Sequence, residues 1–95
     1  MSDKILKYND TEIFIIFDEN GDIWFRYKDV LDILGYNDSR KAMSEIKIDN
    51  TFIKTIFNLK KSIKYKIHNL QPNTKMINNN GLFMVLSVSN FNQNR

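Results

Sequence analysis

Few side chains in this sequence could catalyse a reaction or bind a metal ion. The chain has no cysteine and one histidine, His68, so it lacks a thiol nucleophile and the usual ligand sets for zinc. Four aspartates, Asp18, Asp22, Asp29 and Asp32, lie close enough in sequence to bind a cation. Their places beside an expected turn and in an expected helix explain them better. Because nucleotide-binding glycine loops and nucleophile motifs are also absent from the sequence, we expect no enzyme, no metal site and no cofactor.

Basic side chains are the second chemical feature, and their distribution is uneven. Residues 50–95 contain seven Lys and Arg and no acid, whereas residues 1–49 contain eleven acids and seven bases. A stretch with cations and no anions presents a positive surface that attracts polyanions. The alternative explanation is that exposed lysines do no more than solvate a surface. An AT-rich genome also raises the content of Lys, Asn and Ile. The charge pattern therefore favours nucleic-acid binding without requiring it.

The chain that must position these groups has 95 residues, enough for one hydrophobic core and too few for two. Its 42% hydrophobic and 13% aromatic content is that of a folded protein. No apolar run is long enough to span a membrane, and the N-terminus has no signal-peptide core. We therefore expect a single domain over residues 1–95, intracellular, not secreted and without a membrane partner.

The first half of the chain predicts a hairpin followed by two helices. Apolar, β-branched runs at 11–17 and 22–26 flank Asn20-Gly21, a pair that tolerates positive φ, so the runs are expected to form a β-hairpin. Helical spacing then begins at Lys28 and ends at Gly35, the expected left-handed stop. A second helix is expected over 38–46, with Asn37 or Asp38 as its N-cap.

The second half is less uniform in its pattern. Residues 51–59 fit a helix and a strand equally well, whereas 62–68 alternates strictly and predicts a strand with a basic outer face. A short strand over 74–77 and a helix over 80–89 complete the prediction. The fold class is α+β, with a small sheet that includes the N-terminal hairpin packed against short helices. The expected buried residues are Ile13, Ile15, Phe17, Trp24, Val30, Leu34, Met43, Ile46, Leu82, Val85 and Leu86.

The two short helices and the tight turn at 35–38 resemble a helix-turn-helix, in which the second helix enters the major groove of DNA. Arg40 is the sharpest candidate, because its planar guanidinium can donate to guanine or phosphate through two hydrogen bonds. More commonly, a helical hairpin only covers one face of a sheet. The spacing of the residues alone does not decide between this structural role and DNA binding. The predicted nucleic-acid contacts are Ser39, Arg40, Lys41, Lys60, Lys61, Lys64 and Lys66.

Residues 23–43, IWFRYKDVLDILGYNDSRKAM, resemble Bro-N, the N-terminal domain of baculovirus repeated ORF proteins and phage antirepressors. A second stretch at 74–89, TKMINNNGLFMVLSVS, is similar to the family's strand-then-helix segment. Three positions depart from the pattern, because Asn79, Asn80 and Phe83 stand where the family usually has Glu, Ser and Tyr. The matching positions of the first stretch are Trp24-Phe25, Lys28-Asp29-Val30, Leu34-Gly35-Tyr36-Asn37 and Lys41-Ala42.

This resemblance implies a Bro-N-like fold and DNA binding with weak sequence preference, in a regulatory protein of a large DNA virus or phage that acts in the cytoplasm or nucleus of the host cell. Duplex DNA is the expected ligand, and RNA is the other nucleic acid considered. The family domain usually continues into another helix, so the chain is either a fragment or a short member that completes its core as a homodimer. The alternative function is an antirepressor-like module that binds a protein partner or dimerises without contacting nucleic acid.

Overall fold

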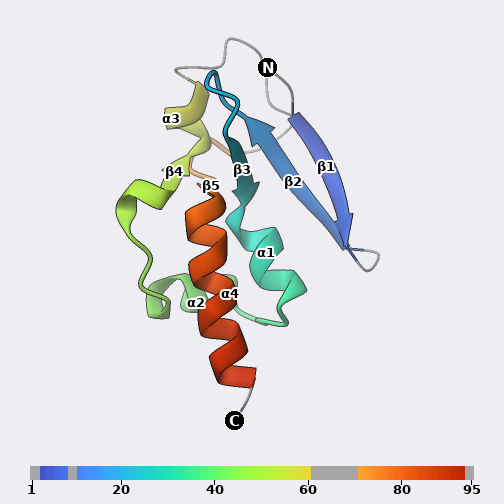
Figure 1. The fold of residues 1–95 in the computed structure, drawn as a ribbon, viewed down its shortest axis with the longest axis vertical. Helices are drawn as coiled ribbons and strands as arrows, with labels where there is room; N and C mark the ends of the chain where they lie inside the picture. The colour runs from blue at the N-terminus through green and yellow to red at the C-terminus, as the bar shows by residue number, and fades with distance from the viewer. Residues whose placement is uncertain (1–2, 9–10, 61–70, 94–95) are drawn as a thin grey trace.

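The computed structural model describes residues 3–8, 11–60 and 71–93, and the predicted strand over 62–68 lies outside these ranges. Figure 1 shows a small sheet from which the longest helix extends towards the C-terminus. The elements are β1 (Asp3–Tyr8), β2 (Thr11–Phe17), β3 (Ile23–Arg26), α1 (Tyr27–Ile33), α2 (Ser39–Glu45), a 3₁₀ turn (Asn50–Phe52), β4 (Ile53–Thr55), α3 (Ile56–Lys60), β5 (Lys75–Ile77) and α4 (Asn79–Gln93).

The described strands form one antiparallel sheet in the order β1-β2-β3-β5-β4. The expected α+β class and the hairpin of β2 and β3 are confirmed, with Ile15 opposite Phe25. Strand β5 pairs with β3 through Phe25 and Ile77, which joins the two halves of the chain. β1 was not predicted, and the stretch 51–59 proves to be part 3₁₀ turn, part strand and part helix.

Asp18 organises the turn between β2 and β3. Its carboxylate oxygen Oδ1 accepts the backbone N–H groups of Asn20 and Asp22 at 2.9 and 3.0 Å. The other oxygen, Oδ2, accepts the indole N–H of Trp24 at 3.0 Å. Gly21 has a φ of 84°, the left-handed conformation that the Asn20-Gly21 pair predicted. The turn therefore depends on one ionised side chain as well as on glycine.

The stability contributed by Asp18 is expected to fall in acid. Burial by itself raises the pKa of Asp18, but the Trp24 hydrogen bond, the backbone N–H groups of Asp22 and Asn20 and the charge of Lys54 together hold it below its ordinary value. A lowered folded-state pKa stabilises the fold above the unfolded-state pKa of about 3.9, and this contribution is lost as the pH falls through the folded-state value. In urea unfolding, Asp18→Asn should be less stable than the parent at neutral pH, and the difference should shrink towards low pH. A difference that stays constant with pH would contradict this account.

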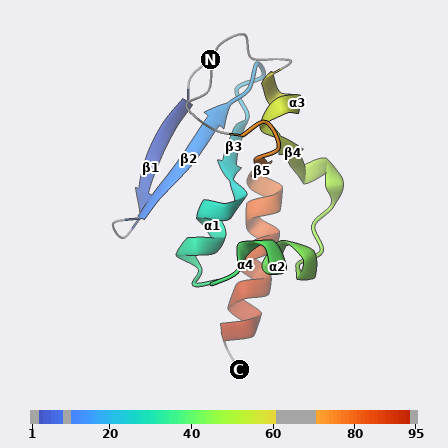
Figure 2. The ribbon, with the colours of Figure 1, turned by 180° about the vertical axis from the view of Figure 1, so that it is seen from behind.

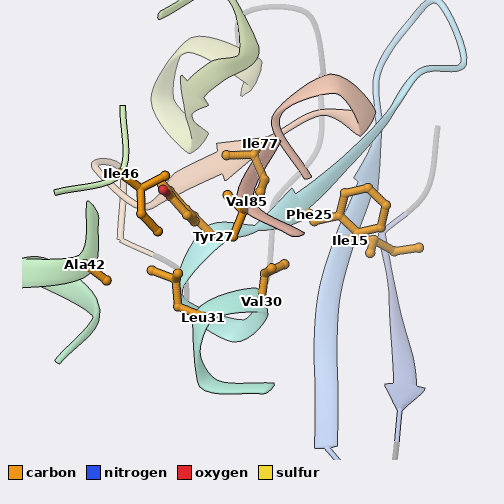
Figure 3. Packing of buried hydrophobic residues seen from close by; sticks show 9 residues of the cluster. All are labelled: Ile15, Phe25, Tyr27, Val30, Leu31, Ala42, Ile46, Ile77 and Val85. Atoms are coloured by element: carbon orange, nitrogen blue, oxygen red, sulfur yellow. The ribbon is translucent and has the colours of Figure 1, made fainter. Parts of the chain in front are cut away.

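Side chains alternate between the two faces of the sheet along each strand, and a hydrophobic cluster covers each face. Figure 3 shows one cluster, in which Ile15 and Phe25 of the sheet meet residues of α1, α4 and the α2 region. The cluster also contains Tyr27, whose hydroxyl has no hydrogen-bond partner among the described residues. Burial, and secondarily Tyr36, raises the pKa of Tyr27 to about 12, so its hydroxyl stays protonated. On the opposite face, a second cluster contains Phe14, Ile16, Trp24, Ile56, Leu59 and Met76.

Helix α4 packs on the sheet through small residues. Gly81 is buried, and a Cβ placed there would lie 3.1 Å from the Ile77 Cβ and 3.3 Å from the Phe52 Cβ and carbonyl oxygen. Val85 and Ser89 continue this buried stripe at four-residue spacing. The prediction that Leu86 is buried was wrong: the residue is 37% exposed, because it lies about 100° around the helix from Val85. Five other residues expected inside are only partly buried: Ile13, Phe17, Leu34, Met43 and Leu82.

Candidate nucleic-acid interface

A groove of about 540 Å³ opens between the start of α1, the length of α2 and the turn that precedes β5. Figure 2 shows α1 and α2 on the near side of the molecule, with α4 behind them. Four of the lining residues carry positive charge and none carries negative charge. The remaining lining residues supply hydroxyl, amide and thioether groups. The full lining is Arg26, Lys28, Ser39, Arg40, Met43, Ser44, Asn73, Thr74 and Lys75.

Arg26 enters the groove at the junction of β3 and α1, where Asp29 organises the backbone. The register of the hairpin places Phe14 opposite Arg26, but the paired residues end one position earlier, at Ile15 and Phe25. The side chain of Asp29, in the first turn of α1, accepts the Phe14 N–H at 2.9 Å instead. Its second oxygen lies 3.8 Å from Nη1 of Arg26. Asp29 thus joins the hairpin to the helix and limits the positions open to the Arg26 guanidinium.

Helix α2 supplies the second wall of the groove. Gly35, with a φ of 90°, ends the turn after α1 in the predicted left-handed conformation. Asp38 is the N-cap, and its carboxylate accepts the Lys41 backbone N–H at 3.1 Å. The cap fixes the start of α2 beside the groove, so that Ser39 and the exposed Arg40 line it.

The third wall is the turn before β5, which is held by the neighbouring start of α3. The backbone N–H of Ile56 donates to the Thr74 carbonyl at 2.9 Å, and the N–H of Phe57 donates to the Pro72 carbonyl at 2.8 Å. Lys75 follows this turn and is exposed. These backbone bonds place Lys75 opposite α2 without using its charged group.

Two of the four groove cations lie near acids of α1. Lys28 Nζ is 3.1 Å from the Asp32 carboxylate, and both side chains are exposed, so this pair contributes little to stability. Arg26 has the more distant Asp29 contact described above. No ion pair is present for Arg40 or Lys75 within the part of the chain that the structure describes. Because Arg40 and Lys75 are exposed and have no such acid, an anion could approach them at low cost.

The structure brings together only some of the residues predicted from the sequence. Ser39 and Arg40 line the groove, whereas Lys41 is exposed on α2 and does not line it. Lys60 belongs to α3, whose buried residues pack on the opposite face of the sheet. Lys61, Lys64 and Lys66 lie outside the described residues. A nucleic-acid contact at any of these seven positions stays a prediction.

Only Lys54 and Lys75, of the seven cations of residues 50–95, have described side chains, so the expected positive surface of the second half stays a prediction. Lys75 lines the groove together with Arg40, whereas Lys54 Nζ lies 5.4 Å from the ring centroid of Trp24 on the opposite face. Three groove residues were not predicted from the sequence: Arg26, Lys28 and Lys75. Arg26 and Lys28 flank the junction of a predicted strand and helix, which was a usable signal. The approach of Lys75 depends on the pairing of β3 with β5 and had no local signal.

The described residues lack two kinds of feature. They contain no group of three or more His, Cys, Asp and Glu side chains arranged to hold a metal ion. None of their helices is both long and apolar enough to cross a membrane.

Comparison with known proteins identifies one family. No curated protein and no solved structure matches the chain. Residues 12–95 match Bro-N, described as "BRO family, N-terminal domain". This match covers both stretches on which the resemblance was based and almost the whole chain. The chain therefore belongs to the BRO family and represents its N-terminal domain.

Proposed function

We propose that this chain is a DNA-binding domain of a regulatory protein and that it holds duplex DNA in the groove between α1, α2 and β5. The observation that carries the proposal is the convergence of four cations, from three separate stretches of the chain, on a groove without an acid. Membership of the BRO family supports the same ligand class. Polyanions bind such surfaces through phosphate contacts that release counterions.

The groove favours phosphate contacts over base readout. Two of its cations, Lys28 and Lys75, are point charges on flexible stems, which carry little sequence information. Arg40 is the groove residue of α2 that could donate to a base through a planar fork. We therefore propose weak sequence preference.

Fluorescence anisotropy with labelled duplex DNA tests the function. The affinity should fall with salt along a slope of log K against log [salt] of about −3 to −4, as expected for up to four phosphate contacts. Two duplexes of unrelated sequence should bind within about threefold of each other. Absence of binding at about 50 mM salt would contradict the proposal. Tighter binding of an RNA duplex or a single strand would assign the groove to that polymer.

A second candidate function rests on the outer face of α4. Phe83 is 71% exposed and Leu86 is 37% exposed, and residues 79–93 contain no charged side chain. An exposed apolar helix face is typical of a surface that binds protein, including a second copy of the same chain. Sedimentation equilibrium tests the dimer, because a monomer at high micromolar concentration contradicts it.

A further inference from the structure

Arg26 is the groove cation that has a buried hydrogen-bond donor without a partner among the described residues. Its Nε atom is buried and has no hydrogen-bond partner among the described residues. Its Nη1 atom lies 3.8 Å from Asp29 Oδ1, which is too far for a hydrogen bond. Buried donors nearly always have a partner, because an unpaired one has lost water without replacing it. The side chain keeps 32% of its surface exposed, so part of it remains open to a ligand.

Asp29 cannot easily supply the missing bond. Its Oδ2 atom accepts the Phe14 N–H at 2.9 Å, and its side chain is only 14% exposed. A move towards Arg26 would leave the Phe14 N–H unpaired at the end of the β2–β3 ladder. Asp29 therefore restrains the guanidinium by charge without satisfying it.

We propose that Arg26 is the seat for one phosphate group of the DNA backbone, and this inference rests on the proposed function of the groove. A small shift of the side chain away from Asp29 brings the edge formed by Nε and Nη2 to two oxygens of one phosphate. The bound phosphate then supplies the acceptor that Nε lacks. Ser39 and Thr74 line the same groove and bring hydroxyl donors to the same ligand. The exposed Arg40 and Lys75 attract the polymer by charge, and Arg26 fixes where one phosphate lies.

The comparison of Arg26→Lys with Lys47→Arg tests the seat. Both substitutions keep the charge, but the first removes the planar fork from the groove, whereas the second changes an exposed side chain that does not line it. With a duplex that lacks terminal phosphates, Arg26→Lys should bind roughly tenfold or more weakly than the parent. Lys47→Arg should stay within about twofold of the parent, and the salt slope should be unchanged for both variants. Urea unfolding checks that both variants are folded.

Titration of the parent with inorganic phosphate provides a readout that does not depend on a variant. The NMR signal of the Arg26 Nε–H group should shift and saturate, while the Arg40 signal moves little. The Arg26 seat is overturned if Arg26→Lys binds DNA as well as the parent, or if the Arg26 signal does not respond to phosphate. In either case, DNA binding by the parent still supports the proposed function. Failure of the parent to bind duplex at low salt overturns both.

Discussion

We expect the triple variant Arg26→Gln, Arg40→Gln, Lys75→Gln to bind duplex DNA about 100- to 1,000-fold more weakly than the parent at about 0.1 M salt. The three residues come from β3, α2 and β5 and line one groove without an acid. Each lost phosphate contact removes released counterions, so the slope of log K against log [salt] should also fall by about one unit per residue. Anisotropy titrations across a salt series measure both quantities.

A control variant separates the groove from net charge. Lys41→Gln, Lys47→Gln and Lys54→Gln remove the same number of charges from exposed positions that do not line the groove. This variant should lose less than about fivefold in affinity, because only long-range attraction is reduced. Equal losses in the two triple variants would mean that DNA responds to the charge of the whole molecule, and the groove would lose its assigned role.

The largest expected loss of stability comes from Gly81→Val. Even a bare Cβ at Gly81 is crowded by Ile77 and Phe52, at 3.1 and 3.3 Å, and valine adds two methyl groups to it. Overpacking at the contact of α4 with the sheet should cost about 3 kcal/mol. For a domain of this size the melting temperature should then fall by about 10–20 °C. Urea and thermal unfolding followed by circular dichroism measure the change.

Ser87→Val is the matched control for that substitution. Ser87 is exposed on the same helix, so the same β-branched residue meets no crowded neighbour there. Its cost should stay below about 0.5 kcal/mol, because serine and valine have similar helix propensity and the exposed Ser87 hydroxyl loses only its 3.0 Å bond to the Phe83 carbonyl. Gly81→Ala should lie between the two, because the gain in helix propensity opposes a contact that is only slightly too close. A Gly81→Val variant as stable as Ser87→Val would show that α4 can move away from the sheet at little cost.

Features encoded by neighbouring residues were predictable from the sequence. Asn20-Gly21 specified the hairpin turn, Gly35 ended the first helical segment, and Asp38 proved to be the cap that the sequence left open between two positions. In each case a short polar or glycine residue acts on the backbone within a few positions of itself. The strand at 75–77 and the helix after it were also found, because asparagines followed by an apolar pattern of helical spacing indicate a helix start.

Features that depend on distant partners were not predictable in the same way. Phe14 and Ile16 were not expected to be buried, although the run at 11–17 is almost continuously apolar and such runs are typical of strands covered on both faces. The second face of the sheet is covered in part by α3, a helix that the ambiguous pattern of residues 51–59 did not predict. The groove could be predicted only in part, because Lys75 reaches it through the pairing of β3 with β5.

The three-walled construction of the groove limits how far the domain can be reduced. A synthetic peptide covering residues 26–45 would contain α1, the glycine turn and α2, together with Arg26, Lys28 and Arg40. It would lack Asn73, Thr74 and Lys75, as well as the Phe14 N–H that holds Asp29 in place. Helices this short are also unstable in water when isolated. Transplanting the groove into another scaffold would therefore require all three chain segments and the hairpin that supports them.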